Sequence, residues 1–164
     1  MVSSGEVKST KLPLSSLKVP YMRAALDRWR AAASGGALPS ECAVNPLGLA
    51  EAAGFSGLID VLRNPLDFKY RYFGPKMATA LGADYTGRRV SELDPRKYIG
   101  LLMVDYVSAV NDREPVFSRL AMHLDAKRQW SYVRLLMPLS NSGRDADAIW
   151  AVTHYDGGTE PRAG

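Results

Sequence analysis

The chain has 164 residues, of which 46% are hydrophobic and 23% are charged, a composition typical of one globular domain with a real core. The net charge of +4 arises from basic residues scattered along the sequence, so there is no basic stripe and nucleic-acid binding is not expected. A single cysteine excludes an internal disulfide, and no stretch approaches the ~20 apolar residues of a membrane span, so we expect a cytoplasmic protein.

The N-terminal part is expected to hold a tail followed by one amphipathic helix. Residues 1–16 are rich in Ser, Lys and Thr and are assigned to a flexible tail. Met22, Leu26 and Trp29 share one face of a helix assigned to residues 17–34. This face can cover the domain's own sheet or contact a second subunit, and the two arrangements are compatible. We expect a homodimer through it, because Trp is favoured at interface centres.

A domain assigned to residues 35–156 begins with a short helix near residues 47–53 and a hairpin. The strands of this hairpin are placed at residues 58–62 and 68–73, and aromatic residues on alternate positions of the second suit a half-buried sheet. Gly74 and Pro75 then end the strand and start the next helix, because Pro is tolerated in a first helical turn.

The second half of the domain is expected to hold a long helix and three strands. Gly82 suits the C-cap of the short helix, and residues 95–111 form the longest helix. Alternating apolar residues after Pro115 predict a strand, followed by strands at residues 130–139 and 146–154, and residues 157–164 are assigned to a second flexible tail. Two strands, then helices, then three strands is an α+β order.

Several short motifs occur along residues 24–155 in a characteristic order. They are Trp29, Leu38-Pro39, Asn45-Pro46, the set Phe68, Tyr70, Arg71 and Gly74, the set Gly82, Asp84, Thr86 and Gly87, residues 134–139, and the apolar residues 148–152. This pattern resembles a PAS-like family that is frequent in alphaproteobacteria. Asn45 departs from the family pattern, where an acidic residue precedes the proline, and Trp150 stands where a small residue is expected.

The resemblance implies a PAS fold. This fold has a five-stranded antiparallel sheet of spatial order 2-1-5-4-3, with the helices of residues 74–111 on one face. A cavity between the sheet and these helices would hold a small apolar ligand, unless the same residues form plain core. The candidate lining residues are Met77, Leu81, Leu102, Tyr106, Leu120, Met122, Leu135 and Met137.

No catalytic or cofactor-binding set is found in the sequence. His123 and His154 have no metal-ligand spacing, and neither lies on a predicted helix as a haem ligand would. Cys42 lies before the first strand of the hairpin and outside any motif of a flavin-binding light sensor. We therefore expect no cofactor and no metal, and a colourless protein.

Two functions are kept open. The resemblance implies a stand-alone sensory or regulatory module that is not an enzyme and acts by protein–protein interaction in bacterial signal transduction, with a histidine kinase or another PAS protein as the class of partner. The alternative is a small cone-shaped α+β enzyme or a carrier of an apolar ligand. Tyr98, Asp105 and Tyr106 are the residues such an enzyme could use.

Overall fold

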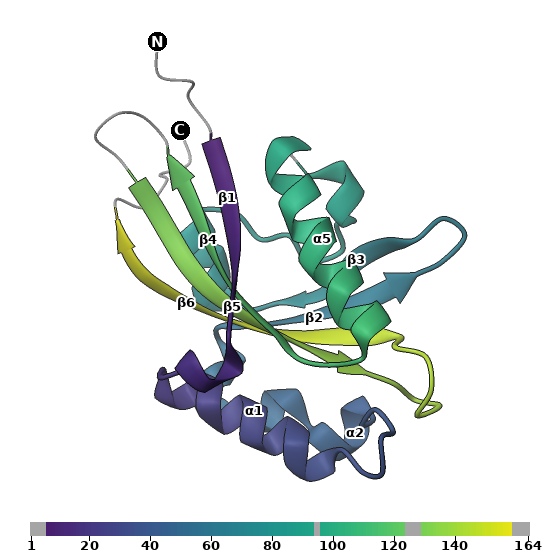
Figure 1. Cartoon of the computed structure of the whole chain (residues 1–164). Helices are drawn as coiled ribbons and strands as arrows, with labels where there is room; N and C mark the ends of the chain where they lie inside the picture. Colours follow the sequence, from purple (N-terminus) through teal and green to yellow (C-terminus); the bar gives the residue numbers. More distant parts are fainter. Residues whose placement is uncertain (1–5, 94–95, 124–128, 159–164) are drawn as a thin grey trace.

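The computed structural model describes the backbone of residues 6–93, 96–123 and 129–158, and the side chains of residues 8–93, 103–121 and 131–155. One antiparallel sheet of six strands organises this part of the chain, in the order β1-β4-β5-β6-β2-β3 (Figure 1). The strands are β1 (Glu6–Leu12), β2 (Ser56–Leu62), β3 (Asp67–Phe73), β4 (Val116–His123), β5 (Gln129–Leu139) and β6 (Ala148–Gly158).

The predicted strand order is confirmed, and the fold is PAS-like. Counted from β2 onward, the five predicted strands lie in the order 2-1-5-4-3. The sixth strand, β1, is a correction to the expected flexible tail at residues 1–16. It pairs with the free edge of β4, where Ser9 lies opposite Leu120, and the 3-10 helix η1 (Leu14–Ser16) follows it. A polar strand at a sheet edge lacks the apolar alternation from which the other strands were predicted.

Helices cover both faces of the sheet. On one face lie α4 (Pro75–Leu81), η3 (Val90–Glu92) and α5 (Arg96–Asp112), as predicted for residues 74–111. On the opposite face lies α1 (Pro20–Ala32), with the short helices α2 (Glu41–Val44), η2 (Pro46–Gly48) and α3 (Ala50–Ala53) beside it (Figure 1). We name these the α5 face and the α1 face. Among the described residues, no helix has the length and apolar character needed to cross a membrane.

The junction between β3 and α4 forms as the sequence predicts. Gly74 is the N-cap of α4, Pro75 is its first residue, and Gly82 closes it in the left-handed conformation with φ of 75°. At Gly74 a Cβ atom would stand 2.3 Å from the backbone oxygen of Gly54. Only glycine therefore allows the chain to leave β3 at this point, and this exit places α4 over the sheet.

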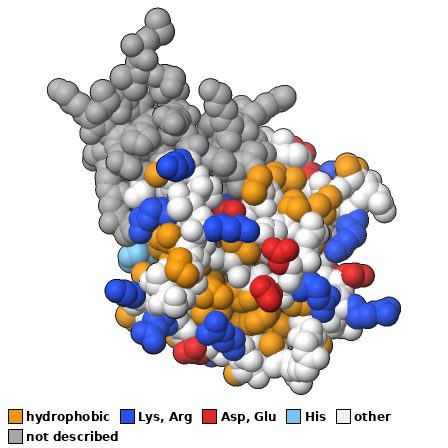
Figure 2. Space-filling model, viewed as in Figure 1, with side chains coloured by type: hydrophobic (Ala, Val, Ile, Leu, Met, Phe, Trp, Pro, Cys, Tyr) orange, Lys and Arg blue, Asp and Glu red, His pale blue; other side chains and the backbone are white. Residues whose placement is uncertain are grey.

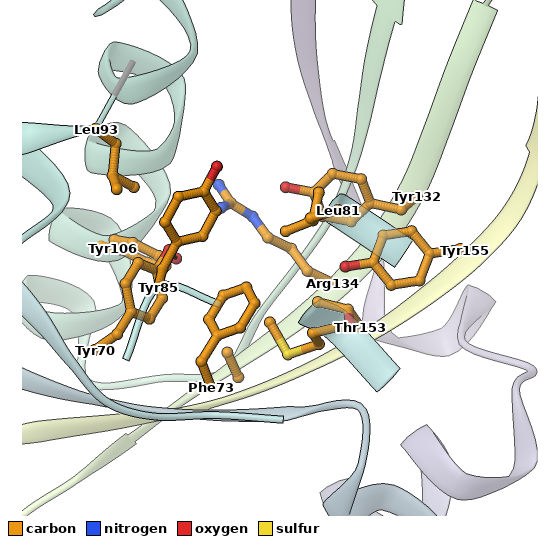
Figure 3. Close-up of a pocket in the computed structure, with 12 residues that line it drawn as sticks. Tyr70, Phe73, Leu81, Tyr85, Leu93, Tyr106, Tyr132, Arg134, Thr153 and Tyr155 are labelled. Atoms are coloured by element: carbon orange, nitrogen blue, oxygen red, sulfur yellow. Dashed lines mark hydrogen bonds between the residues drawn. The ribbon is translucent and has the colours of Figure 1, made fainter. Parts of the chain in front are cut away.

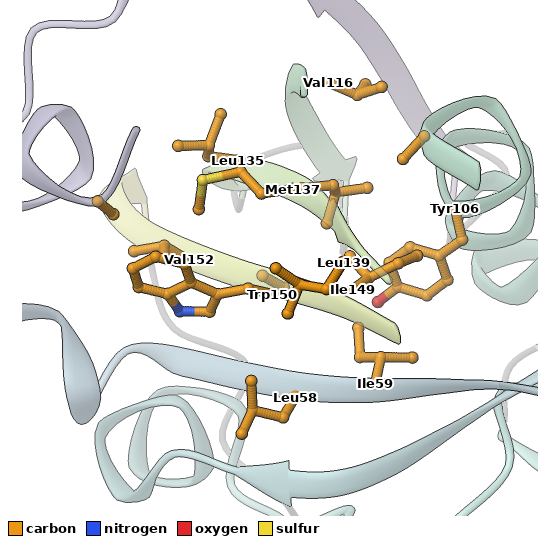
Figure 4. Close-up of a cluster of buried hydrophobic side chains, with 14 of the residues drawn as sticks. Leu58, Ile59, Tyr106, Val116, Leu135, Met137, Leu139, Ile149, Trp150 and Val152 are labelled. Atoms are coloured by element: carbon orange, nitrogen blue, oxygen red, sulfur yellow. The ribbon is translucent and has the colours of Figure 1, made fainter. Parts of the chain in front are cut away.

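The core of the α1 face is apolar and tightly packed. Trp150 and Met137 lie opposite each other on neighbouring strands and are fully buried (Figure 4). The indole N–H of Trp150 donates to Ser56 Oγ at 3.0 Å, and Ser56 Oγ donates to the backbone oxygen of Ala52 at 2.7 Å. Trp150 therefore points away from the α5 face, and its bulk is accommodated under the N-terminal helices.

Candidate functional site

The α5 face encloses a cavity of about 30 Å³ between the sheet and the helices. Its lining comes from β3, α4, the segment before α5, α5, β5 and β6 (Figure 3). The lining residues are Tyr70, Phe73, Met77, Leu81, Tyr85, Leu93, Tyr106, Tyr132, Arg134, Ala151, Thr153 and Tyr155. Five tyrosines and one arginine make this wall far more polar than the core of the α1 face.

One residue of this wall, Arg134, belongs to a buried ion pair. Arg134 in β5 and Asp105 in α5 are each 2% exposed, and Arg134 Nη2 donates to Asp105 Oδ2 at 2.7 Å. The same carboxylate oxygen accepts hydrogen bonds from Ser118 Oγ and Ser9 Oγ, both at 3.0 Å. Three elements besides α5 therefore meet at one carboxylate: β1, β4 and β5. Such a pair is stable only where the surrounding donors are well placed, as they are here.

The tyrosines next to the ion pair are held in their neutral form. The hydroxyl groups of Tyr70 and Tyr106 are 2.8 Å apart, and one donates to the other. Burial raises the pKa of Tyr70 well above its usual value, and the nearby Tyr106 raises it further. Burial also raises the pKa of Tyr106, whose ring lies 5.1 Å from the Arg134 guanidinium. The wall therefore offers neutral hydroxyl groups and one cationic group.

The outer side of the cavity is closed by less buried side chains. Leu81, at the end of α4, and Tyr85, in the following turn, are only partly buried. Tyr85 packs edge-on against Phe73, with the ring centroids 5.3 Å apart. A cavity of about 30 Å³ is far smaller than the roughly 300–1,000 Å³ of a typical small-molecule pocket. A larger ligand must therefore displace side chains of the lining, among which Leu81, Tyr85 and Tyr155 are only partly buried.

The structure brings three of the predicted pocket residues to the cavity. Met77, Leu81 and Tyr106 line it. Leu120 is buried on the same face but does not contribute to the lining. The side chains of Leu102 and Met122 lie outside the described residues.

The prediction was wrong for Leu135 and Met137. Both alternate with Arg134 along β5 and pack under α1, on the face opposite the cavity. Alternation correctly grouped them with each other. It did not reveal which face they occupy, because helices bury both faces of the sheet.

The predicted dimer residues lie against the chain's own sheet. Met22, Leu26 and Trp29 are all buried within the single chain, and Trp29 Nε1 donates to the backbone oxygen of Pro138 at 2.8 Å. Of the two arrangements, the structure therefore shows the one in which this helix covers the chain's own sheet. A homodimer through residues 17–33 stays a prediction, and it would have to use the outer, charged side of α1.

Arg134 was not among the predicted site residues, and Asp105 was assigned only to the alternative enzyme. The available signal was a charged residue at the centre of an apolar strand, between Val133 and Leu135. Such a residue is rarely buried without a partner, so its position predicts a buried carboxylate on a neighbouring element. The cavity tyrosines of β5 and β6, Tyr132 and Tyr155, follow the same alternation as Arg134.

Other reactive side chains lie away from the cavity. His154 lies next to the hydroxyl of Tyr21, 2.9 Å from its Nδ1 atom, and Cys42 is exposed at the other end of the α1 face. Within the described residues, no group of three or more His, Cys, Asp or Glu side chains is placed to hold a metal ion. Among the described residues, the cavity is the site taken as the candidate, because it brings a buried cation and several hydroxyl groups to one enclosed space.

Comparison with known proteins adds two similar structures. No protein-family model and no curated protein matches the chain. The chain is similar to the PAS domain of a protein from Colwellia psychrerythraea, with 12% identity and a TM-score of 0.46 over 67% of this chain and 95% of that one. It is also similar to an RNA-binding light-oxygen-voltage receptor, with 15% identity and a TM-score of 0.44 over 93% of this chain.

The chain spans 39% of the length of the light-oxygen-voltage receptor. Neither similarity assigns a role to any residue of this chain. The PAS-like fold is defined by the chain's own strand order and by the helices on the α5 face.

Proposed function

We propose that this chain is a sensory or regulatory module that acts by protein–protein interaction in bacterial signal transduction, and that its cavity binds a small ligand. The observation that carries the proposal is that Arg134, which lines the cavity, forms a buried ion pair with Asp105. Replacing such a pair by apolar residues often leaves a fold equally stable or more stable. Its position beside a cavity therefore favours a role in binding.

The lining indicates the chemistry of the ligand. Phe73 and Tyr85 offer aromatic surface on the outer side, while Arg134 and the hydroxyl groups of Tyr70 and Tyr106 offer polar groups on the inner side. A small molecule with an apolar or planar body and one acceptor oxygen fits both sides. This extends the expectation of a purely apolar ligand, because the wall contains a guanidinium group.

Protein–protein interaction is proposed as the mode of action. Val104 on α5 is 62% exposed and is a candidate contact residue. Basic and acidic side chains are interspersed on the face seen in Figure 2. We propose a histidine kinase or another PAS protein as the class of partner, and the cytoplasm as the location.

Native mass spectrometry of the purified chain tests the proposal. The expected result is a fraction of molecules heavier than the 17.9 kDa polypeptide, with the extra mass lost under denaturing conditions. The double variant Arg134→Met with Asp105→Leu is the matched variant, because it removes both charges and leaves neither buried alone; it should lose the adduct. Two results would contradict ligand binding in the cavity. One is that the variant retains the same adduct, and the other is that wild-type protein has the mass of the bare polypeptide whatever the growth condition.

A further inference from the structure

The N-terminal strand is attached to the sheet along one edge only, and it buries little apolar surface. β1 is an edge strand that pairs with β4 alone. Within residues 8–12, only Leu12 packs against the hydrophobic core. Pro13 ends the strand before η1, so the strand can leave without moving α1. Elements with few buried apolar contacts open at low free-energy cost.

Between the side chains that the structure describes, two polar contacts join β1 to α5. Ser9 Oγ donates to Asp105 Oδ2 at 3.0 Å, and Lys11 Nζ donates to Ser108 Oγ at 2.7 Å. The lysine contact is exposed to solvent and is therefore weak. The serine contact is partly buried and ends on a charged acceptor, which makes it the stronger of the two.

The acceptor of the serine contact is bonded to a residue of the cavity wall. Asp105 Oδ2 also accepts from Arg134 Nη2, and Arg134 lines the cavity. A ligand oxygen that draws the guanidinium toward itself removes the charge-assisted donor from Asp105. The buried carboxylate then needs another donor, and the edge strand β1 is the element that can move aside to admit water.

We infer that β1 is a displaceable strand whose attachment is controlled from the cavity through Arg134, Asp105 and Ser9. The inference rests on the proposed ligand site and deepens it, because it names the element that responds to binding. In the ligand-free state both Ser9 and Arg134 donate hydrogen bonds to the Asp105 carboxylate. In the bound state Arg134 turns to the ligand, and β1 leaves β4.

Hydrogen exchange of the full chain, followed by mass spectrometry of peptides, tests the attachment. Ser9→Ala should speed exchange of the peptide that covers residues 6–12 by about tenfold, the effect of losing one hydrogen bond to a charged group. Exchange in β5 and β6 should not change. Ser9→Thr keeps the hydroxyl and should behave as wild type. Thr10→Ala, on the exposed side of the same strand, controls for a change in strand propensity.

Two further measurements test control from the cavity. Arg134→Lys keeps the positive charge on a shorter side chain, so the hydrogen bond to Asp105 is weakened. It should speed exchange of β1, and it should add nothing to the effect of Ser9→Ala when the two are combined. Sodium formate, a small carboxylate, should speed exchange of β1 in wild type relative to sodium chloride at equal ionic strength. It should have no further effect in Ser9→Ala, where the contact is already lost.

The outcomes separate this inference from the proposed function. Unchanged β1 exchange in Ser9→Ala would overturn the inference, whatever ligand the cavity holds. If Ser9→Ala frees β1 but neither Arg134→Lys nor formate does, the strand is held by Asp105 without control from the cavity, and the inference is again overturned. In both cases the proposed ligand site still stands or falls with the retained adduct in native mass spectrometry.

Discussion

The two faces of the sheet are built from alternate residues of the same strands, yet they differ in chemistry. On the α1 face, Trp150 and Met137 are fully buried among apolar side chains. On the α5 face, Ala151 and Arg134 from the same two strands line a cavity with tyrosine hydroxyl groups. The difference indicates that the α1 face stabilises the fold, and that the α5 face gives up some of that stability for the cavity proposed as a binding site.

The largest expected effect comes from removing the indole of the α1 face. Trp150→Ala should lower the free energy of unfolding by about 4 kcal/mol, because it leaves a large void and removes the hydrogen bond to Ser56. Trp150→Phe keeps most of the volume and should cost less than half as much. Urea denaturation measures both. A loss below about 1 kcal/mol in Trp150→Ala would show that the α1 face is not the stabilising side.

The next effect comes from breaking the ion pair of the α5 face. Asp105→Asn should cost about 3 kcal/mol, because it leaves the Arg134 charge buried without a carboxylate. The double variant Asp105→Leu with Arg134→Met should restore the stability of wild type or exceed it. If the double variant is as unstable as the single one, the pair stabilises the fold, and the contrast between the two faces is smaller than proposed.

A smaller effect is expected at the contact between α1 and the sheet. Trp29→Phe keeps an aromatic ring and removes the hydrogen bond to the Pro138 oxygen, which should cost about 1 to 2 kcal/mol. Sedimentation should give the same mass for this variant as for wild type, because Trp29 is buried within one chain. A lower mass would favour the predicted homodimer through residues 17–33.

The smallest effect at neutral pH concerns the tyrosines of the α5 face. Burial keeps the pKa of Tyr70 and of Tyr106 above the value of about 10 that tyrosine has in an unfolded chain. Above this pH the unfolded chain releases protons that the folded chain retains, so the stability falls as the pH rises. Tyr70→Phe should reduce this fall by at most about 1.4 kcal/mol for each pH unit.

The pH dependence is measured by urea denaturation at neutral pH and at several alkaline values. The stability of wild type should be level near neutral pH and should decline only above about pH 10. An equal decline in wild type and Tyr70→Phe would show that this hydroxyl is not kept neutral by burial.

The sequence predicted the strand order well, because five strands carry apolar residues on alternate positions and glycine or proline at their ends. It missed β1, since Lys8, Ser9, Thr10 and Lys11 carry no apolar signal. Pairing with β4 depends on a free sheet edge that exists only after the rest of the sheet has formed. A contact of this kind cannot be inferred from local composition.

The site was predicted only in part, for a different reason. Met77, Leu81 and Tyr106 were placed correctly because the helices of residues 74–111 have one side that must face the sheet. Leu135 and Met137 were placed on the wrong face, because both faces of β5 are buried and both sets of alternate residues are largely apolar. Arg134 was the one residue of β5 that could have settled the choice.

The two buried indoles of the α1 face also have an optical consequence. Trp29 and Trp150 are the tryptophans whose side chains the structure describes, and each donates its N–H to a buried oxygen on the α1 face. Their emission should therefore be that of indoles shielded from solvent. The tyrosines of the cavity absorb at shorter wavelengths, so ultraviolet spectroscopy can follow ligand binding on one face separately from unfolding of the other.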